Sequence, residues 1–282
     1  ILKRGLLSKN PYLASALISM YAKCGMLSKA QQVLEELPIR NLVCWNALIG
    51  GYVQQGQGYE ALNCFERMQS EGLSPNVVTS TCILKACASV GDIDKGERTH
   101  ENVVSMGWLH KDIMLGNALV DMYAKCGMLI KAHQVLKELP IRNTVTWSAL
   151  IAGYTKQGQG HAALNCFEWM QSEGLLADVV TFTSLLKACS ITGTIAKGKQ
   201  IHDEIVTRGF LKTDMVLGNA LVDMYAKCGA LERAKEVLQE LPIHDVVSWS
   251  SLIAGYVQQQ NGDEALKCFE QMQNEGLSPD AV

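Results

Sequence analysis

The sequence predicts an all-α solenoid of tandem helix-turn-helix repeats, and three observations support this fold. The string Met-Tyr-Ala-Lys-Cys-Gly begins at Met20 and returns after 102 residues each time, at Met122 and Met224. Apolar residues recur at helical spacing, and no segment alternates in the manner of a strand. One helical pair cannot bury its apolar face alone, so we expect stacked pairs with a shared core and a concave groove.

Each 102-residue block divides into a short unit of 31 residues, a standard unit of 35 and a long unit of 36. The short units are 11–41, 113–143 and 215–245. The standard units are 42–76, 144–178 and 246–280, and the long units are 77–112 and 179–214. Residues 1–10 match the end of a long unit, and residues 281–282 match the start of the next one. We therefore predict a single solenoid over residues 1–282, with eight complete units.

The standard unit 42–76 illustrates the two helices expected in each unit. Its first helix has an apolar face at i, i+3, i+4 and i+7, formed by Trp45, Leu48, Ile49 and Tyr52. Gln55-Gly56-Gln57-Gly58 interrupts this helix. The second helix places Ala61, Phe65 and Met68 on one face, and Gly72 suits its C-cap. In the short unit 11–41, Pro38 ends the second helix.

Composition limits the classes of function. The net charge is −3, which argues against a bulk basic surface of the kind that coats duplex DNA. The 10 cysteines include no Cys-x-x-Cys, and we expect reduced, small core residues. No apolar run reaches 18 residues, so no membrane span is predicted. The chain begins at Ile1 without an Arg/Ser-rich leader, and we interpret it as an excerpt of a longer protein.

Two families of helical pairs fit this pattern. Tetratricopeptide repeats place a Gly directly after the Leu of the first helix and have a fixed length of about 34 residues. Here Ile49, Ile151 and Ile253 occupy that position, and the unit lengths vary. The sequence instead resembles the pentatricopeptide repeat family, specifically its PLS class, which alternates motifs of these three lengths. The strings that carry the resemblance are Val246–Tyr256, Glu275–Asp280, Gly116–Gly127 and Gly218–Gly229.

The resemblance implies a right-handed superhelical solenoid that binds single-stranded RNA, one base per repeat. The fifth and last residues of each motif would read the base. The fifth positions are Ser15, Asn46, Thr81, Asn117, Ser148, Thr183, Asn219 and Ser250. The last positions are Asn41, Asn76, Asp112, Asn143, Asp178, Asp214, Asp245 and Asp280. The second residue of each motif would sandwich bases, at Val43, Val78, Met114, Val145, Val180, Val216 and Val247.

Each of these positions has an alternative interpretation. An Asp or Asn directly before a helix is what an N-cap requires, and this role is compatible with base reading. A Val near a helix start is often an ordinary packing residue. Four lysines near the ends of first helices would contact phosphates or simply lie in solvent: Lys23, Lys125, Lys156 and Lys227.

The family's pairing rules translate the fifth and last residues into bases. Ser or Thr with Asn favours A, and with Asp favours G. Asn with Asp favours U, and Asn with Asn favours a pyrimidine. The eight units then predict A, C/U, G, C/U, G, G, U, G from the RNA 5′ end to its 3′ end. The long-unit pairs Thr81/Asp112 and Thr183/Asp214 follow the rules least closely.

The chain is similar to organellar RNA-editing specificity factors of land plants, which implies a place in the mitochondrion or chloroplast. Such factors often carry a C-terminal zinc deaminase with His-x-Glu and Pro-Cys-x-x-Cys. His202-Asp203-Glu204 matches the first half only, so we expect no catalytic site, metal or cofactor in this chain, and His100 and His202 should be packing residues. Class members bind small editing accessory proteins. The alternative function is accordingly a protein-protein interaction scaffold that binds a peptide or such a partner.

Overall fold

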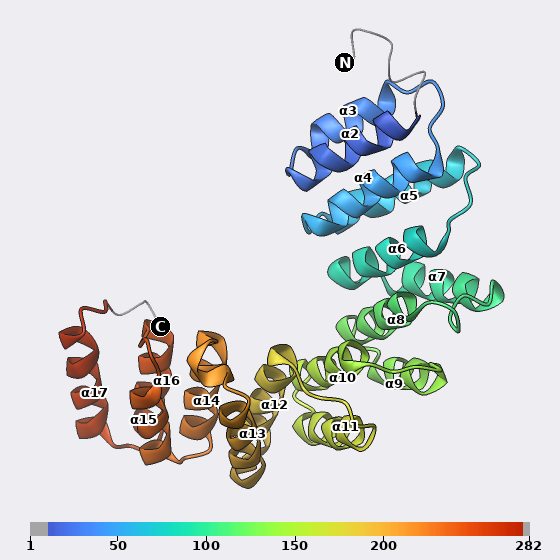
Figure 1. Cartoon of the computed structure of the whole chain (residues 1–282). Helices are drawn as coiled ribbons and strands as arrows, with labels where there is room; N and C mark the ends of the chain where they lie inside the picture. Colours follow the sequence, from blue (N-terminus) through green and yellow to red (C-terminus); the bar gives the residue numbers. More distant parts are fainter. Residues whose placement is uncertain (1–10, 279–282) are drawn as a thin grey trace. The chain divides into compact units, whose positions relative to one another are not determined.

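The computed structural model describes residues 11–278. These residues form sixteen α-helices and one 3-10 helix, with no strand among them (Figure 1). The predicted all-α repeat solenoid is therefore confirmed. The expectations for residues 1–10, Asp280 and residues 281–282 lie outside the described residues.

The chain forms two compact halves, which meet in sequence between Arg142 and Asn143. The helices of the N-terminal half are α2 (Pro11–Lys23), α3 (Leu27–Glu35), α4 (Leu42–Gln54), α5 (Gly58–Ser70), α6 (Val77–Val90), α7 (Ile93–Ser105), α8 (Ile113–Lys125) and α9 (Leu129–Glu138). Those of the C-terminal half are α10 (Thr144–Lys156), α11 (Gly160–Ser172), α12 (Val179–Thr192), α13 (Ile195–Thr207), η2 (Phe210–Lys212), α14 (Met215–Lys227), α15 (Leu231–Glu240), α16 (Val246–Gln258) and α17 (Gly262–Asn274).

Within each half the helices pack in two layers. The first helices of successive units pack side by side: α2 on α4, α4 on α6 and α6 on α8, and then α10 on α12, α12 on α14 and α14 on α16. Each second helix packs on its own first helix and on the first helix of the next unit in the same half. The core lies between these layers, and Trp45, Leu48 and Ile49 of α4 are fully buried in it.

The first helix of each unit begins at the first residue of that unit, from Pro11 of α2 to Val246 of α16. The physical cause is the side chain just before it. Asn41 has an extended backbone, and its Oδ1 accepts a hydrogen bond from the backbone N–H of Cys44 at 2.9 Å. This bond satisfies one of the free donors of the first turn.

Close helix packing explains one recurring glycine. A Cβ on Gly51 of α4 would come within 2.4 Å of the Cβ of Ala22 in α2. In the C-terminal half, a Cβ on Gly255 of α16 would come within 2.9 Å of the Cβ of Ala226 in α14. Glycine at this position therefore lets the first helices of a short and a standard unit approach closely.

The cysteines only partly match their expected place in the core. All ten are free thiols, and six of them are buried: Cys44, Cys64, Cys87, Cys166, Cys189 and Cys268. Burial raises the pKa of the Cys87 thiol to about 12, which suppresses its reactivity. Cys24 is exposed, so the expectation was wrong there, because it follows the last turn of α2. No helix within residues 11–278 is long and apolar enough to cross a bilayer.

Candidate nucleic-acid interface

The last residue of each unit caps the first helix of the next unit. Asn76 shows the full arrangement, in which its Oδ1 accepts from the backbone N–H of Thr79 at 3.0 Å and its own N–H donates to the Thr79 hydroxyl at 3.2 Å. The side chain of every described last residue accepts such a backbone hydrogen bond: Asn41, Asn76, Asp112, Asn143, Asp178, Asp214 and Asp245. The capping interpretation is thus confirmed for all seven.

Three of the fifth residues also contact the last residue of their own unit. Asn46 Nδ2 donates to Asn76 Oδ1 at 3.2 Å, and Asn219 Nδ2 donates to Asp245 Oδ2 at 2.8 Å. The Ser148 hydroxyl lies 3.5 Å from Asp178 Oδ1. Folding therefore joins side chains that are far apart in sequence, in a standard unit of each half and in one short unit of the C-terminal half.

The fifth residues of the long units donate to their own helix, as Ser148 also does to the carbonyl of Thr144 at 2.6 Å. The Thr81 hydroxyl donates to the carbonyl of Val77 at 2.9 Å, and that of Thr183 donates to the carbonyl of Val179 at 2.8 Å. Each hydroxyl has one proton, which is used within its own helix. Ser15 likewise donates to the carbonyl of Tyr12 at 3.0 Å. The protons of these hydroxyls are therefore not available to the last residue, unlike the amide N–H groups of Asn46 and Asn219.

The other fifth residues have less defined partners. Asn117 is buried in α8, which belongs to the N-terminal half. Asn143, the last residue of the same unit, belongs to the C-terminal half, where it caps α10. Ser250 lies half-buried in α16, and its expected partner Asp280 lies outside the described residues.

The seven candidate sandwich residues form an exposed apolar set. Each is the second residue of a first helix, one turn before the fifth residue, and each is 54–60% exposed. Exposure of an apolar side chain to water is unfavourable, and a ligand stacked on it removes that apolar surface from water. Since Val43, Val78 and the other five lie outside the core, packing in the interior does not account for them.

Electrostatics near the cap differ between units. Partial burial of Asp245 opposes ionisation of its carboxyl. Hydrogen bonds from the backbone N–H of Ser248 and the amide of Asn219 outweigh burial and lower the pKa of Asp245 below its usual value. Asp245 is therefore an anion at neutral pH, whereas the equivalent Asn76 is neutral.

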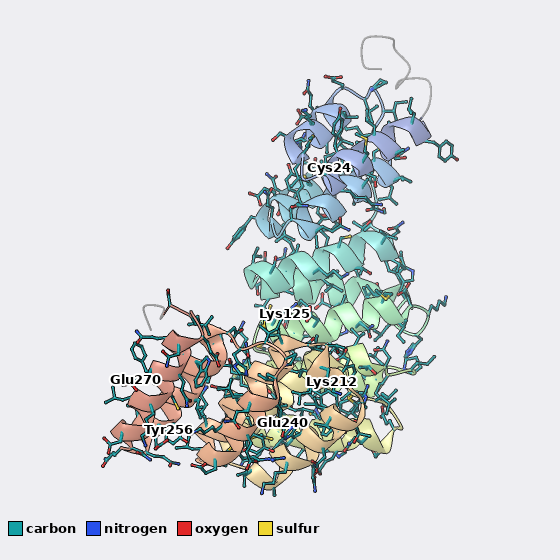
Figure 2. The ribbon with its side chains drawn as sticks, turned by 60° about the vertical axis from the view of Figure 1, so that its left-hand side comes forward. Cys24, Lys125, Lys212, Glu240, Tyr256 and Glu270 are labelled. Carbon is teal, nitrogen blue, oxygen red and sulfur yellow. The ribbon has the colours of Figure 1, made fainter. Side chains whose placement is uncertain are left out.

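Two of the four candidate phosphate lysines are already paired. Lys125, labelled in Figure 2, is the last residue of α8. Its Nζ lies 2.8 Å from Asp121, and the Nζ of Lys227 lies 2.9 Å from Asp223 in α14. Lys23 and Lys156 are exposed at equivalent helix ends. The carboxylate four residues before each of these two lysines neutralises part of its positive charge, which weakens its attraction for a phosphate.

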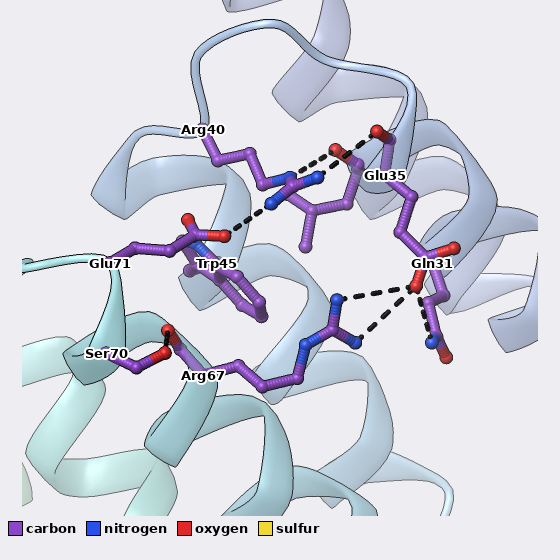
Figure 3. Close-up of polar contacts among 8 residues, drawn as sticks. Gln31, Glu35, Arg40, Trp45, Arg67, Ser70 and Glu71 are labelled. Carbon is purple, nitrogen blue, oxygen red and sulfur yellow. Dashed lines mark hydrogen bonds and ion pairs between the residues drawn. The ribbon is translucent and has the colours of Figure 1, made fainter.

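A second set of contacts holds the standard units together and was not predicted from the sequence. The Trp45 indole N–H donates to Glu71 Oε2 at 3.0 Å, and Arg40 forms an ion pair with the same carboxylate (Figure 3). Arg40 Nε also donates to the carbonyl of Leu34 at 3.0 Å. In the C-terminal half, His244 takes the place of Arg40, and its Nδ1 lies 2.9 Å from Glu275. The recurrence of Trp and Glu 26 residues apart is the signal that could have revealed this contact.

A third-position hydroxyl was also missed. The Thr79 hydroxyl, three residues after the cap Asn76, donates to Asn46 Oδ1 at 2.7 Å. In the C-terminal half, the hydroxyls of Thr181 and Ser148 lie 2.5 Å apart. Ser or Thr recurs at this position in α6, α10, α12 and α16, which is the signal of a capping box.

The candidate zinc histidine is a packing residue, as predicted. His202 is buried in α13, and its Nδ1 lies 3.0 Å from the hydroxyl of Tyr225. His100 of α7 makes the same contact with Tyr123 at 2.9 Å. Within residues 11–278, no three His, Cys, Asp or Glu side chains gather as metal ligands.

The chain is a helical repeat protein, because its helical pairs stack in succession. Its units repeat an exposed apolar residue near the start of the first helix and polar fifth and last residues. The family model described as PPR repeat family matches residues 40–89, 142–190 and 244–282. The model described as PPR repeat matches residues 13–42, 117–143, 180–210 and 219–246. The chain belongs to the pentatricopeptide repeat family.

Similar proteins come from Arabidopsis thaliana. Pentatricopeptide repeat-containing protein At2g33680 is 37% identical over 270 residues, which cover 96% of this chain and 37% of that protein. The mitochondrial protein At3g09040 is 38% identical, with 98% and 27% covered. The chloroplastic protein At4g18520 is 34% identical, with 99% and 45% covered. The chain therefore spans less than half the length of these relatives.

Crystal structures of the pentatricopeptide repeat protein PPR10 share the fold. The PPR10 structure in complex with an 18-nt psaJ RNA element has a TM-score of 0.77 at 22% identity, covering 95% of this chain and 40% of PPR10. The structure of PPR10 from maize gives a TM-score of 0.76.

Proposed function

We propose that this chain binds single-stranded RNA and reads one base per unit. The observation that carries the proposal is the repeated pairing of two features at the start of the first helices. An exposed apolar side chain, such as Val43, lies one turn from a fifth residue that hydrogen-bonds the last residue, such as Asn46 with Asn76. An apolar side chain can sandwich a base without regard to sequence, and a polar pair can recognise its edge.

The base order follows from the pairs. We propose the target A-Y-G-Y-G-G-U-G, from 5′ to 3′, where Y is C or U. The hydrogen bonds of Asn46 with Asn76 and of Asn219 with Asp245 support the second and seventh bases. The hydroxyl protons of Thr81, Ser148 and Thr183 go to the helix backbone, so the third, fifth and sixth bases carry less of the specificity.

We place the chain in the PLS class, as the recognition tract of an organellar RNA-editing or RNA-processing factor. The 31–35–36 cycle of unit lengths supports the class, and the mitochondrial and chloroplastic relatives support the compartment. The chain itself acts as a binder without a catalytic site. Any C-to-U deamination belongs to the rest of a longer protein, and small editing accessory proteins are proposed partners.

Binding to labelled RNA oligomers tests the proposal. Fluorescence anisotropy should show that A-C-G-C-G-G-U-G binds more tightly than a scrambled 8-mer of the same composition. Equal affinity for both would overturn base-specific reading. A chain that ignores RNA but retains peptides from a library on the same support would favour the scaffold alternative.

A further inference from the structure

A hydroxyl outside the fifth and last positions controls how Asn46 is oriented. The Thr79 hydroxyl lies 2.7 Å from Asn46 Oδ1 and 3.0 Å from Asn76 Oδ1, and its single proton goes to the nearer Asn46 Oδ1. Asn46 Nδ2 donates to Asn76 Oδ1 at 3.2 Å. The carbonyl end of the Asn46 amide therefore faces Thr79, and its NH2 end faces Asn76. Thr79 is fully buried, so its hydroxyl reaches only protein partners.

The hydrogen bonds leave a specific set of groups for a ligand. Asn76 Oδ1 already accepts from Asn46 Nδ2 and from the backbone N–H of Thr79 at 3.0 Å. Asn46 Oδ1 is engaged by the Thr79 hydroxyl. The donors that these bonds leave free are one N–H of the Asn46 amide and the NH2 of Asn76. Both asparagines are half-buried, so a base can approach them.

Asn219, the fifth residue of the third short unit, is not held by a third-position hydroxyl in this way. Asn219 Nδ2 donates to Asp245 at 2.8 Å, but Asn219 Oδ1 is buried and has no hydrogen-bond partner in the described part of the chain. The equivalent hydroxyl belongs to Ser248, and it donates to the carbonyl of Asp245 at 2.9 Å instead. A buried carbonyl without a partner favours rotation toward a donor that a ligand brings.

We propose that Thr79, the third residue of the following unit, is a positioning residue that makes the second base a cytosine. This inference rests on the proposed function. Cytosine presents two adjacent acceptors, O2 and N3, to the two donors that Thr79 leaves free at Asn46 and Asn76. Uracil presents an N3–H between its two oxygens, which faces a donor and is disfavoured. At the seventh base, the unpaired carbonyl of Asn219 accepts the uracil N3–H.

The test compares two RNA oligomers, A-C-G-C-G-G-U-G and A-U-G-C-G-G-U-G, by fluorescence anisotropy on the whole chain. The unmodified chain should prefer the cytosine oligomer by about fivefold, the effect of one hydrogen bond. Thr79→Val removes the hydroxyl at nearly constant volume and should bring the ratio to about one. The control is Thr99→Val, which removes another buried hydroxyl, bonded to the carbonyl of Lys95, and should keep the ratio.

A second variant, at Ser248, tests the inference at the seventh base and keeps the cap residue Asp245. Ser248→Ala removes a third-position hydroxyl that donates to the carbonyl of Asp245 instead of Asn219, so it should keep the preference for U at the seventh base. Melting temperatures measured beside each ratio separate positioning from capping. If Thr79→Val lowers the melting temperature but keeps the cytosine preference, Thr79 is a cap residue only and the inference is overturned. If the unmodified chain binds neither oligomer, the proposed function fails and the inference with it.

Discussion

The indole N–H of Trp45 donates to the Glu71 carboxylate at 3.0 Å, and this bond links the two segments that carry the proposed base-reading pair Asn46 and Asn76. Trp45 directly precedes Asn46, and Glu71 lies five residues before Asn76 in the chain. The contact recurs between Trp147 and Glu173 at 2.8 Å and between Trp249 and Glu275 at 2.9 Å. It therefore ties the first helix of each standard unit to the C-terminal end of its second helix.

Loss of this carboxylate should weaken both folding and reading. Glu71→Ala removes the partner of Trp45 and Arg40, and we expect a loss of about 1.5–3 kcal/mol of stability, the range for hydrogen bonds to charged groups. Urea titration by circular dichroism measures it. The control Glu66→Ala removes an exposed carboxylate that pairs with Lys95 and should cost under about 1 kcal/mol. Equal losses in the two variants would show that the Trp45 contact contributes no more than a surface ion pair.

The exposed valines at the second position should contribute to RNA affinity and not to stability. Val247 and Val257 both lie on α16 and are 55% and 59% exposed, but only Val247 occupies the second position. Val247→Ala should weaken binding of the 8-mer about threefold, since it removes part of a stacking surface. Val257→Ala should leave binding unchanged, and both should keep stability within about 0.5 kcal/mol. Identical affinities for the two variants would remove Val247 from the interface.

Buried His202 should make the fold sensitive to mild acid. Burial lowers the pKa of His202 below its usual 6.5, with a smaller contribution from Arg233. The unfolded chain then takes up a proton at higher pH than the folded chain. Stability is fully present above pH 6.5 and falls as the pH drops below that value toward the folded pKa. Melting curves from pH 7.5 to 5.0 should fall less steeply for His202→Phe than for the unmodified chain. Parallel curves would contradict this assignment.

Neutralising the acids beside two lysines should strengthen RNA binding. Asp121 and Asp223 pair with Lys125 and Lys227, so a double Asp121→Asn, Asp223→Asn variant frees two cations. We expect about fivefold tighter binding, from about 0.5 kcal/mol for each pair, and a steeper dependence on salt. Anisotropy titrations at salt concentrations between about 50 and 200 mM measure both the affinity and its dependence on salt. An unchanged slope would place these lysines away from the phosphates.

Much of the fold follows from local sequence rules. The Asn or Asp before each first helix predicts where that helix begins, because few other side chains can satisfy the free backbone donors there. Helical spacing of Trp45, Leu48 and Ile49 predicts the buried face. The i,i+4 acid beside Lys125 is visible in the sequence as well, and it reduces the charge assigned to that lysine.

Other features depend on side-chain geometry that spacing does not determine. A hydroxyl at the third position can turn toward the preceding fifth residue, as in Thr79, or toward a backbone carbonyl, as in Ser248. The Thr81 proton likewise goes to the Val77 carbonyl, although its position in the unit matches that of Asn46. The division of the chain near Arg142 has no sequence signal either, because the repeat pattern continues through it.

We propose that the fifth and last residues of a unit together select one base, and a single substitution tests this most directly. Asn219→Thr replaces the amide that donates to Asp245 with a hydroxyl, as in the pair of Ser148 with Asp178. Anisotropy with four 8-mers that differ only at the seventh base gives the preference. We predict a change from U to G there, with the other bases unaffected. A seventh-base preference that stays at U, with RNA binding retained, would contradict the claim.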